Sequence, residues 1–180
     1  MNSRLQKINK KKEYFEYFLS LLFNWNSKIG SKESLTKLRL QKMLFLASTV
    51  NATKEHHPLL DLFDRFYALP YGPVEMDIYE SMQLNNFRYY KFENNDCVSK
   101  NKEEVYSDLN MTIKDEIKSA VQSLKNMKVN YLTMPVFDLV NITHNWTVWQ
   151  RSMYIARLLS SRKERMSTDA ILTSENKFFG

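Results

Sequence analysis

The chain has 180 residues, of which 43% are hydrophobic and 13% aromatic, so it can bury the core of about one domain and is too apolar to be disordered. Three glycines are too few for the many tight corners of a β-sandwich or barrel, which makes helices the default expectation. One cysteine, Cys97, excludes an internal disulfide and a cysteine-based zinc site, and no run approaches the roughly 18 apolar residues of a membrane-spanning helix.

The formal net charge of +6 is concentrated at the N-terminus. Residues 1–12 hold five of the 26 basic side chains and none of the 20 acidic ones, so residues 13–180 hold 21 and 20, a net charge of +1. We therefore predict a basic N-terminal tail over residues 1–12 and a single domain over residues 13–180. The chain starts without the apolar stretch of a secretion signal, from which we expect a cytoplasmic protein.

Apolar residues recur at helical spacing in most of the remaining sequence. The segment 35–50 is apolar on nearly all sides, which predicts a helix in the middle of the fold and leaves Gln41 and Lys42 as polar side chains that need partners. The Lys42 ammonium is expected to reach solvent along its own aliphatic stem. The aromatic segment 87–100, interrupted by a polar turn, predicts a small β-hairpin. The expected fold is mainly α, a single compact multi-helix domain with that hairpin. The predicted helices cover residues 13–26, 35–50, 59–69, 74–84, 112–127, 133–144, about 149–159 and 168–179.

Two of the four prolines and one of the three glycines fall within Pro70-Tyr71-Gly72-Pro73. Residues before proline are driven out of helical conformation, so Leu69 and Gly72 are expected to be extended. We predict that one helix ends at Leu69 and that Gly72 caps the next, with Pro73 in its first turn. Tyr71 would then sit on a rigid corner, packing either inward against the domain or outward toward a partner.

The chain lacks the glycine-rich phosphate loops, HExxH and paired CxxC motifs that mark many enzymes. His144 is the most suggestive of three histidines, but its expected place at the end of a helix suits its charge and donors without catalysis. Glu75 and Asp77, in the first turn of a predicted helix, are explained by the helix dipole. We predict no catalytic residue, no cofactor and no metal.

A nucleic-acid partner is an alternative hypothesis. Lys10–Lys12 could contact phosphates, and the strip Arg88–Phe92 interleaves basic and aromatic residues that could stack on bases. The near-neutral charge of residues 13–180 argues against nucleic acid as the main partner.

Three segments resemble the signature of the Panacea domain, the SocA-like antitoxin domain of bacteria and phages. Residues 40–47, LQKMLFLA, are similar to its LQK-LLYLA helix, and Tyr71-Gly72-Pro73-Val74 followed by Tyr79 is similar to its YGPV-x4-Y motif. Thr143-His144 with Trp149 resembles its third block, so the likeness extends over residues 35–149. This chain departs from the family in Ala68-Leu69-Pro70, which lacks the usual tryptophan, and in Phe45 and Val148.

The resemblance implies an antitoxin that neutralises a toxin by direct binding, often a toxin that blocks translation or nucleotide metabolism, and hence a role in phage defence. One branch of the family instead delivers its toxin to a protease. Many members carry an N-terminal DNA-binding domain, for which the residues before Leu35 leave no room. The motif residues are expected either to bind the partner or to hold the domain together, in which case the hairpin, the tail and the last helix would choose the toxin. These candidate residues are Gln41, Lys42, Tyr71, Gly72, Pro73, Val74, Tyr79, Thr143, His144 and Trp149.

Overall fold

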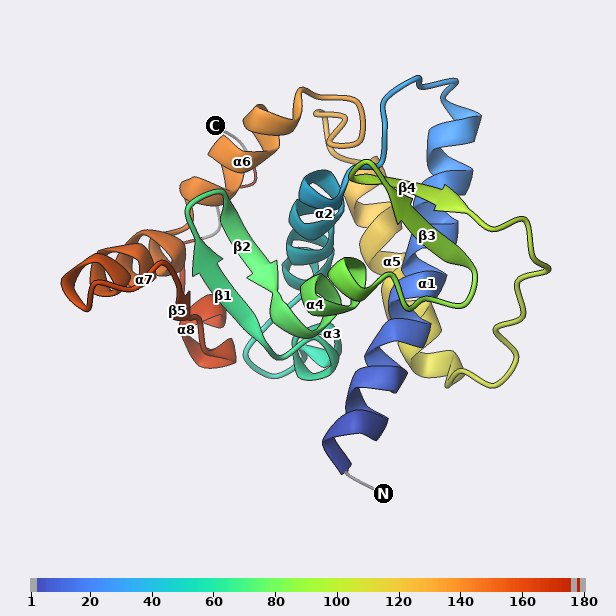
Figure 1. The fold of residues 1–180 in the computed structure, drawn as a ribbon. Coiled ribbons are helices and arrows are strands. Elements are labelled where there is room, and N and C mark those ends of the chain that lie inside the picture. Colours follow the sequence, from blue (N-terminus) through green and yellow to red (C-terminus); the bar gives the residue numbers. More distant parts are fainter. Residues whose placement is uncertain (1–2, 176–177, 179–180) are drawn as a thin grey trace.

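The computed structural model describes residues 3–175 and 178, which form eight helices and five short strands (Figure 1). The predicted fold class, mainly α with small antiparallel sheets, is confirmed. In chain order the elements are α1 (Ser3–Lys28), α2 (Lys37–Val50), α3 (Pro58–Leu62), β1 (Phe66–Leu69), β2 (Gly72–Glu75), α4 (Met76–Leu84), β3 (Tyr90–Glu93), β4 (Asp96–Ser99), α5 (Met111–Lys125), α6 (Val136–His144), α7 (Thr147–Leu158), β5 (Glu164–Arg165) and α8 (Thr168–Leu172).

Helix α2 lies in the middle of the molecule, with α1 and α5 on one side and the strands β1 and β2 on the other (Figure 1). Every residue from Arg39 to Thr49 is buried, which confirms the helix expected from its all-round apolar pattern. The hydroxyl of Thr36 caps the helix by accepting from the Arg39 N–H.

The basic N-terminal tail is a wrong prediction. Helix α1 begins at Ser3 among the described residues, and Lys11 is fully buried. Lys11 precedes Tyr14 and Phe18 by three and seven residues, so it lies on the apolar side of the helix that packs into the core.

The predicted helix over residues 59–69 is also wrong. Helix α3 ends at Leu62, and Phe66–Leu69 forms strand β1, paired antiparallel with β2 from Phe66↔Glu75 to Leu69↔Gly72. Leu69 is extended as expected, and Gly72 begins strand β2, although its φ of +94° is not the extended conformation expected of a residue before proline. Strands on both sides of a two-residue loop make a hairpin, not a helix corner. The next helix therefore begins at Met76, capped by Glu75 instead of Gly72.

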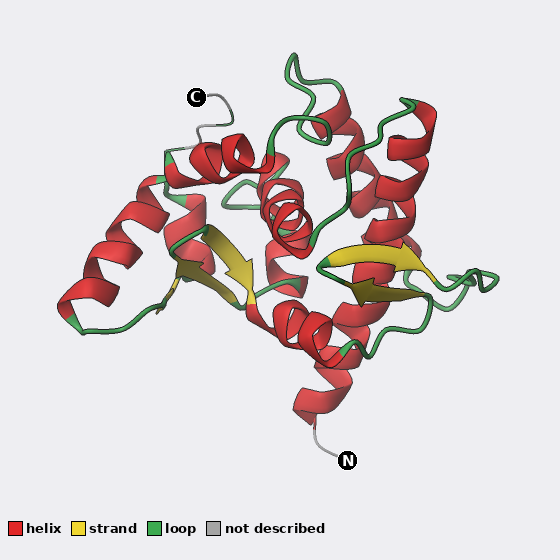
Figure 2. Cartoon of the chain, turned by 45° about the horizontal axis from the view of Figure 1, so that its top comes forward, coloured by secondary structure: helices red, strands yellow, loops and turns green. Residues whose placement is uncertain are grey.

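The β-hairpin and the helices predicted between residues 112 and 159 are confirmed with small shifts, whereas the last predicted helix is much shorter than expected. The second hairpin is β3–β4, and it is separate from the three-stranded sheet β2-β1-β5 (Figure 2). Helices α5, α6 and α7 lie within a few residues of their predicted places, with Asn110 capping α5. The last predicted helix is short, α8, and residues 176, 177 and 179 of that prediction lie outside the described residues. None of the described helices has both the length and the apolar character to span a membrane.

Candidate partner-binding site at the β1–β2 hairpin

The β1–β2 hairpin turns through Pro70 and Tyr71. Gly72 follows with φ of +94°, a conformation open to glycine because it lacks a Cβ. Tyr71 projects from the tip with 62% of its surface exposed, and its ring lies edge-on to that of Phe137 on α6, with centroids 6.4 Å apart. Phe137 is itself 61% exposed. Tyr71 therefore faces solvent and not the core, which answers the choice that the sequence left open.

Lys42 supports the hairpin from behind. Its side chain is fully buried and its Nζ donates to the Pro73 carbonyl at 2.6 Å. Within the described residues, no carboxylate lies within 4.0 Å of this Nζ. Burial without a counter-charge lowers the pKa of Lys42 to about 7. The expectation that the Lys42 ammonium reaches solvent is therefore wrong, and a backbone carbonyl serves as its partner in the interior.

Gly72 is where residues from three motif segments meet. A Cβ at this position would lie 2.5 Å from Thr143 Oγ1 and 3.0 Å from Lys42 Nζ. Thr143 is itself fully buried and donates to the Val140 carbonyl. The close approach of α2 and α6 to the strand thus requires glycine for space as well as for its backbone conformation.

Gln41 fixes the other end of β2. Its Oε1 accepts from the backbone N–H of Glu75 at 2.9 Å, and Glu75 Oε2 accepts from the Ile78 N–H at 2.8 Å. These bonds join α2, the end of the hairpin and the start of α4. Gln41 thus has a structural partner of the kind that its buried position demands.

His144 and Trp149 complete the support. Their rings stack with centroids 3.7 Å apart and 12° between planes, and Trp149 Nε1 donates to the Leu69 carbonyl at 3.0 Å. Burial and the nearby Lys42 charge lower the pKa of His144, so a neutral imidazole stacks on the indole. The charged, dipole-stabilising histidine expected from the sequence is therefore not the favoured form.

The structure brings most of the predicted residues to this one hairpin. Pro73 and Val74 are buried in β2, and Tyr79 is half-buried on α4. Tyr71 alone among the ten points outward as a largely exposed side chain. The side chains of the motifs are mostly engaged in holding the backbone.

The sequence prediction missed a buried ion-pair cluster at the base of the hairpin. Lys11 Nζ lies 2.6 Å from Glu75, 2.5 Å from Asp77 and 2.7 Å from Asp64. Arg65 pairs with Asp77. The helical spacing of Lys11 with Tyr14 and Phe18 was the signal that could have placed this lysine inside.

The oppositely charged groups in this cluster stabilise one another's charged forms. Burial opposes the protonated form of Lys11, but the Glu75 charge and the bonds to Asp64 and Asp77 outweigh it and raise the pKa of Lys11. Burial raises the pKa of Glu75, and Lys11 opposes that shift. Asp64, Glu75 and Asp77 are close enough to share a cation, and the Lys11 ammonium lies within 2.7 Å of all three.

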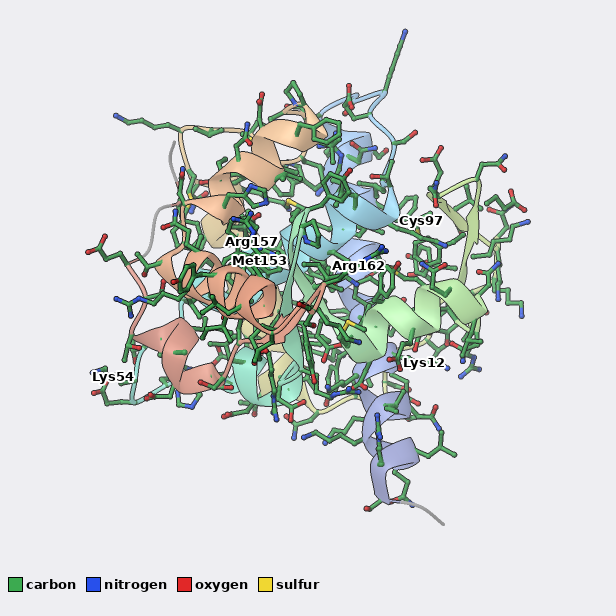
Figure 3. The ribbon with its side chains drawn as sticks, turned by 60° about the vertical axis from the view of Figure 1, so that its left-hand side comes forward. Lys12, Lys54, Cys97, Met153, Arg157 and Arg162 are labelled. Atoms are coloured by element: carbon green, nitrogen blue, oxygen red, sulfur yellow. The ribbon has the colours of Figure 1, made fainter. Side chains whose placement is uncertain are left out.

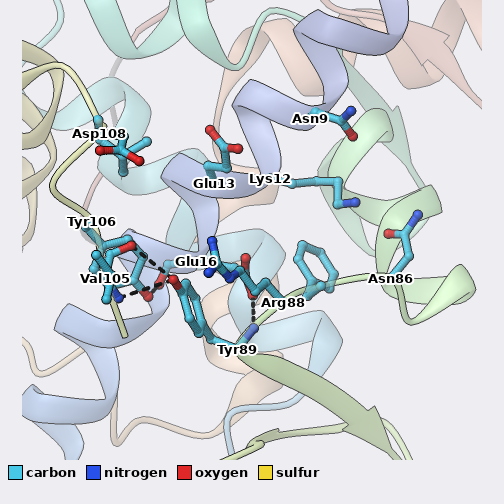
Figure 4. Close-up of a pocket in the computed structure, with 12 residues that line it drawn as sticks. Asn9, Lys12, Glu13, Glu16, Asn86, Arg88, Tyr89, Val105, Tyr106 and Asp108 are labelled. Carbon is cyan, nitrogen blue, oxygen red and sulfur yellow. Dashed lines mark hydrogen bonds between the residues drawn. The ribbon is translucent and has the colours of Figure 1, made fainter. Parts of the chain in front are cut away.

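The basic-aromatic strip does not offer its rings to bases. Tyr89, Tyr90 and Phe92 are buried, so they cannot stack on nucleotides as the alternative hypothesis requires. Beside them lies a cavity of about 330 Å³ whose lining includes Lys12 and Arg88 (Figure 4). The buried Glu16 at this cavity accepts from the Tyr89 N–H at 2.6 Å, which fixes β3 to α1.

The chain was compared with families and with individual proteins. The model of the family described as "Antitoxin SocA-like, Panacea domain" matches residues 40–150. Neither the curated proteins nor the solved structures gave a match. The match covers more than half of the chain and contains the hairpin with the α2, α6 and α7 residues that support it, so this protein belongs to the SocA-like Panacea-domain antitoxin family.

Proposed function

We propose that this protein is the antitoxin of a toxin–antitoxin pair and that it neutralises its cognate toxin by binding it directly. The observation that supports direct binding is the exposed aromatic pair formed by Tyr71, at the tip of the hairpin, and Phe137 on α6. The hairpin is held from behind by Lys42 and Trp149. Exposed aromatic side chains on a rigid support make effective anchors for a partner, because little conformational entropy is lost when they are buried.

The toxin is proposed to be an inhibitor of translation or nucleotide metabolism, and the pair to act in the cytoplasm in phage defence. These assignments rest on what the family implies. An adaptor that hands its toxin to a host protease is the second form of the same proposal, and it too requires a surface that binds the toxin.

We propose that the protein acts without catalysis. The groups in the motif segments that could take part in chemistry have structural tasks: Lys42 donates to the Pro73 carbonyl, and Trp149 both stacks on His144 and donates to the Leu69 carbonyl. A reacting lysine or histidine would need access to a substrate, and Lys42 is fully buried.

The test is co-expression with the product of the open reading frame adjacent to this gene. That product alone should arrest growth, and wild-type antitoxin should restore growth and co-purify with it. The double variant Tyr71→Ala/Phe137→Ala should lose rescue while its melting temperature stays close to that of the wild type, because both side chains are exposed. The matched control is Leu84→Ala, an exposed apolar residue on α4, which should rescue fully.

If the adjacent product is harmless and no complex forms, the proposed function is wrong. If rescue is normal but Tyr71→Ala/Phe137→Ala also rescues, the function stands and the hairpin tip is not the contact.

A further inference from the structure

Helix α7 exposes a row of large apolar side chains on its outer side. Tyr154, Ile155, Leu158 and Leu159 are 64%, 44%, 67% and 67% exposed. The first three are spaced at i, i+1 and i+4, so they lie on one side of the helix, and Leu159 is its C-cap residue. Together the four side chains form what we call the α7 face. The opposite side, including Met153 and Ala156, is buried, and α7 packs against β1 and β5.

Cations border the α7 face. Residues 147–165 contain five basic side chains and one acidic side chain, a net charge of +4. Arg151, Arg157, Arg162 and Arg165 have no carboxylate within 4.0 Å in the described part of the chain. In Figure 3 α7 comes to the front of the molecule, where Arg157 and Arg162 are labelled.

The exposed apolar side chains and the surrounding basic residues together indicate the chemistry of a partner. We propose that the α7 face docks the cognate toxin through an apolar groove on the toxin bordered by acidic side chains. The inference rests on the proposed function and adds to it the chemistry of the toxin surface and a second contact besides the hairpin tip. Burial of the four apolar side chains supplies the anchor, and the arginines set orientation and association rate.

The charge and the apolar character of the α7 face argue against two other partners, a second copy of this chain and a nucleic acid. A symmetric contact between two copies would bring two regions of net charge +4 together, which like-charge repulsion opposes. Nucleic acid would satisfy the arginines but would leave exposed aliphatic side chains at the centre of the surface without a matching groove. A protein groove that is apolar at its centre and acidic at its border can bind both the apolar side chains and the arginines.

The geometry also places this surface on a firm support. Trp149, in the first turn of α7, donates to the Leu69 carbonyl of the hairpin, and Lys163, after the helix, lies 5.5 Å from the Tyr67 ring centroid. Helix α7 is thus attached to strand β1 at its first turn, and the segment that follows the helix contacts the same strand. A partner seated on the α7 face would meet a surface whose backbone is already ordered.

The experiment measures binding of each purified variant to the purified product of the adjacent open reading frame by titration calorimetry. Leu158→Glu should weaken binding by at least about tenfold, as expected for loss of a buried anchor. Its control is Leu84→Glu, equally exposed on α4, which should change the dissociation constant by less than about twofold. Circular dichroism checks that both variants are folded.

A second set of variants tests the role of charge. Arg157→Glu/Arg162→Glu reverses two cations at the α7 face, and its control, Lys32→Glu/Lys54→Glu, changes the net charge by the same amount at other exposed sites. Wild-type binding should weaken as salt rises from 50 to 300 mM, and the arginine variant should bind more weakly with a flatter salt dependence. The lysine variant should keep most of the wild-type affinity and salt slope.

Normal binding by both Leu158→Glu and Arg157→Glu/Arg162→Glu would overturn the proposal while leaving the antitoxin function intact. So would a wild-type dimer in light scattering that Leu158→Glu dissociates without loss of toxin binding. Co-sedimentation with phosphatidylserine vesicles that depends on Leu158, beside normal toxin binding, would assign the face to membranes. If the wild type itself fails to bind or neutralise the adjacent product, the proposed function is wrong and this inference falls with it.

Discussion

Gly72, in strand β2, and Lys42, behind it on α2, lie next to each other in the interior, and each is constrained by its buried surroundings. Gly72 combines a positive φ with a neighbour that leaves no room for a Cβ. Lys42 holds an ammonium in the interior with only a carbonyl and no carboxylate as its bonding partner. Both constraints arise because α2, α6 and β2 approach one another closely.

The first prediction at this scale concerns glycine. Gly72→Ala should lower the free energy of unfolding by about 2–5 kcal/mol, because backbone strain and steric overlap with Thr143 add together. Gly30→Ala is the control: Gly30 also has a positive φ, +61°, but nothing lies within 4 Å of the added Cβ, so a loss of about 1 kcal/mol is expected. Urea denaturation measures both. Equal losses would show that strain alone governs Gly72.

The second prediction concerns the pKa of Lys42, which burial lowers from 10.5 to about 7. Between these values the unfolded chain binds more protons than the folded one, so this lysine makes stability rise with pH. Relative to Lys42→Met, the wild type should gain about 2 kcal/mol of unfolding free energy between pH 7 and pH 9. Denaturation curves at pH 7, 8 and 9 test this. Parallel pH profiles for the two proteins would mean that the folded lysine keeps its ordinary pKa.

At the scale of elements, α1 is joined to the β1–β2 hairpin by Lys11. Its Nζ is surrounded by Asp64, which precedes β1, and by Glu75 and Asp77, which flank the start of α4. One lysine therefore fixes the register of a helix against two chain segments, the one before β1 and the one at the start of α4.

The third prediction is that Lys11→Met destabilises the protein by about 3–5 kcal/mol at pH 7, because Glu75 and Asp77 would be left as buried charges without their ammonium. In the variant the pKa of Glu75 would lie further above its unfolded value of 4.5. The loss of unfolding free energy of Lys11→Met relative to the wild type should therefore become smaller as pH falls toward 4.5 and larger as pH rises. Lys10→Met, at an exposed neighbouring position, is the control and should stay within about 0.5 kcal/mol of the wild type. A pH-independent deficit would contradict this account.

At the scale of the whole molecule, the domain includes the segment that composition marked as a tail. Residues 3–6 at the start of α1 are exposed, but by Lys11 the helix is part of the core. The boundary of the cooperative unit therefore lies within residues 1–12 and not after them.

The fourth prediction uses two truncations. Removal of residues 1–6 should change the free energy of unfolding by less than about 1 kcal/mol, because the described residues among them are exposed. Removal of residues 1–12 should cost more than about 3 kcal/mol, because Lys11 and its ion pairs are lost. Thermal melts of the two purified proteins compare them, and two truncations of equal stability would restore the tail interpretation.

Local sequence signals were enough to predict the helical class, the buried helix α2 and the β3–β4 hairpin, because periodicity and turn residues act over a few neighbouring residues. The sequence also carried the family motifs, whose match to residues 40–150 established the antitoxin-like domain. Local rules placed Leu69 in extended conformation correctly, but they missed the positive φ of Gly72 and could not tell a helix corner from a hairpin.

That Phe66–Glu75 forms two strands depends on long-range contacts, because their pairing is completed by β5 and by Lys42, which are distant in sequence. The burial of Lys11 and the exposure of Tyr71 likewise depend on the fold of the whole chain. Helical spacing puts Lys11 on the apolar side of α1, but it does not supply the counter-charges that burial of an ammonium requires, and no local pattern sets the direction of Tyr71. The partners of these two side chains, three carboxylates for Lys11 and the Phe137 ring for Tyr71, are brought close only when the chain has folded.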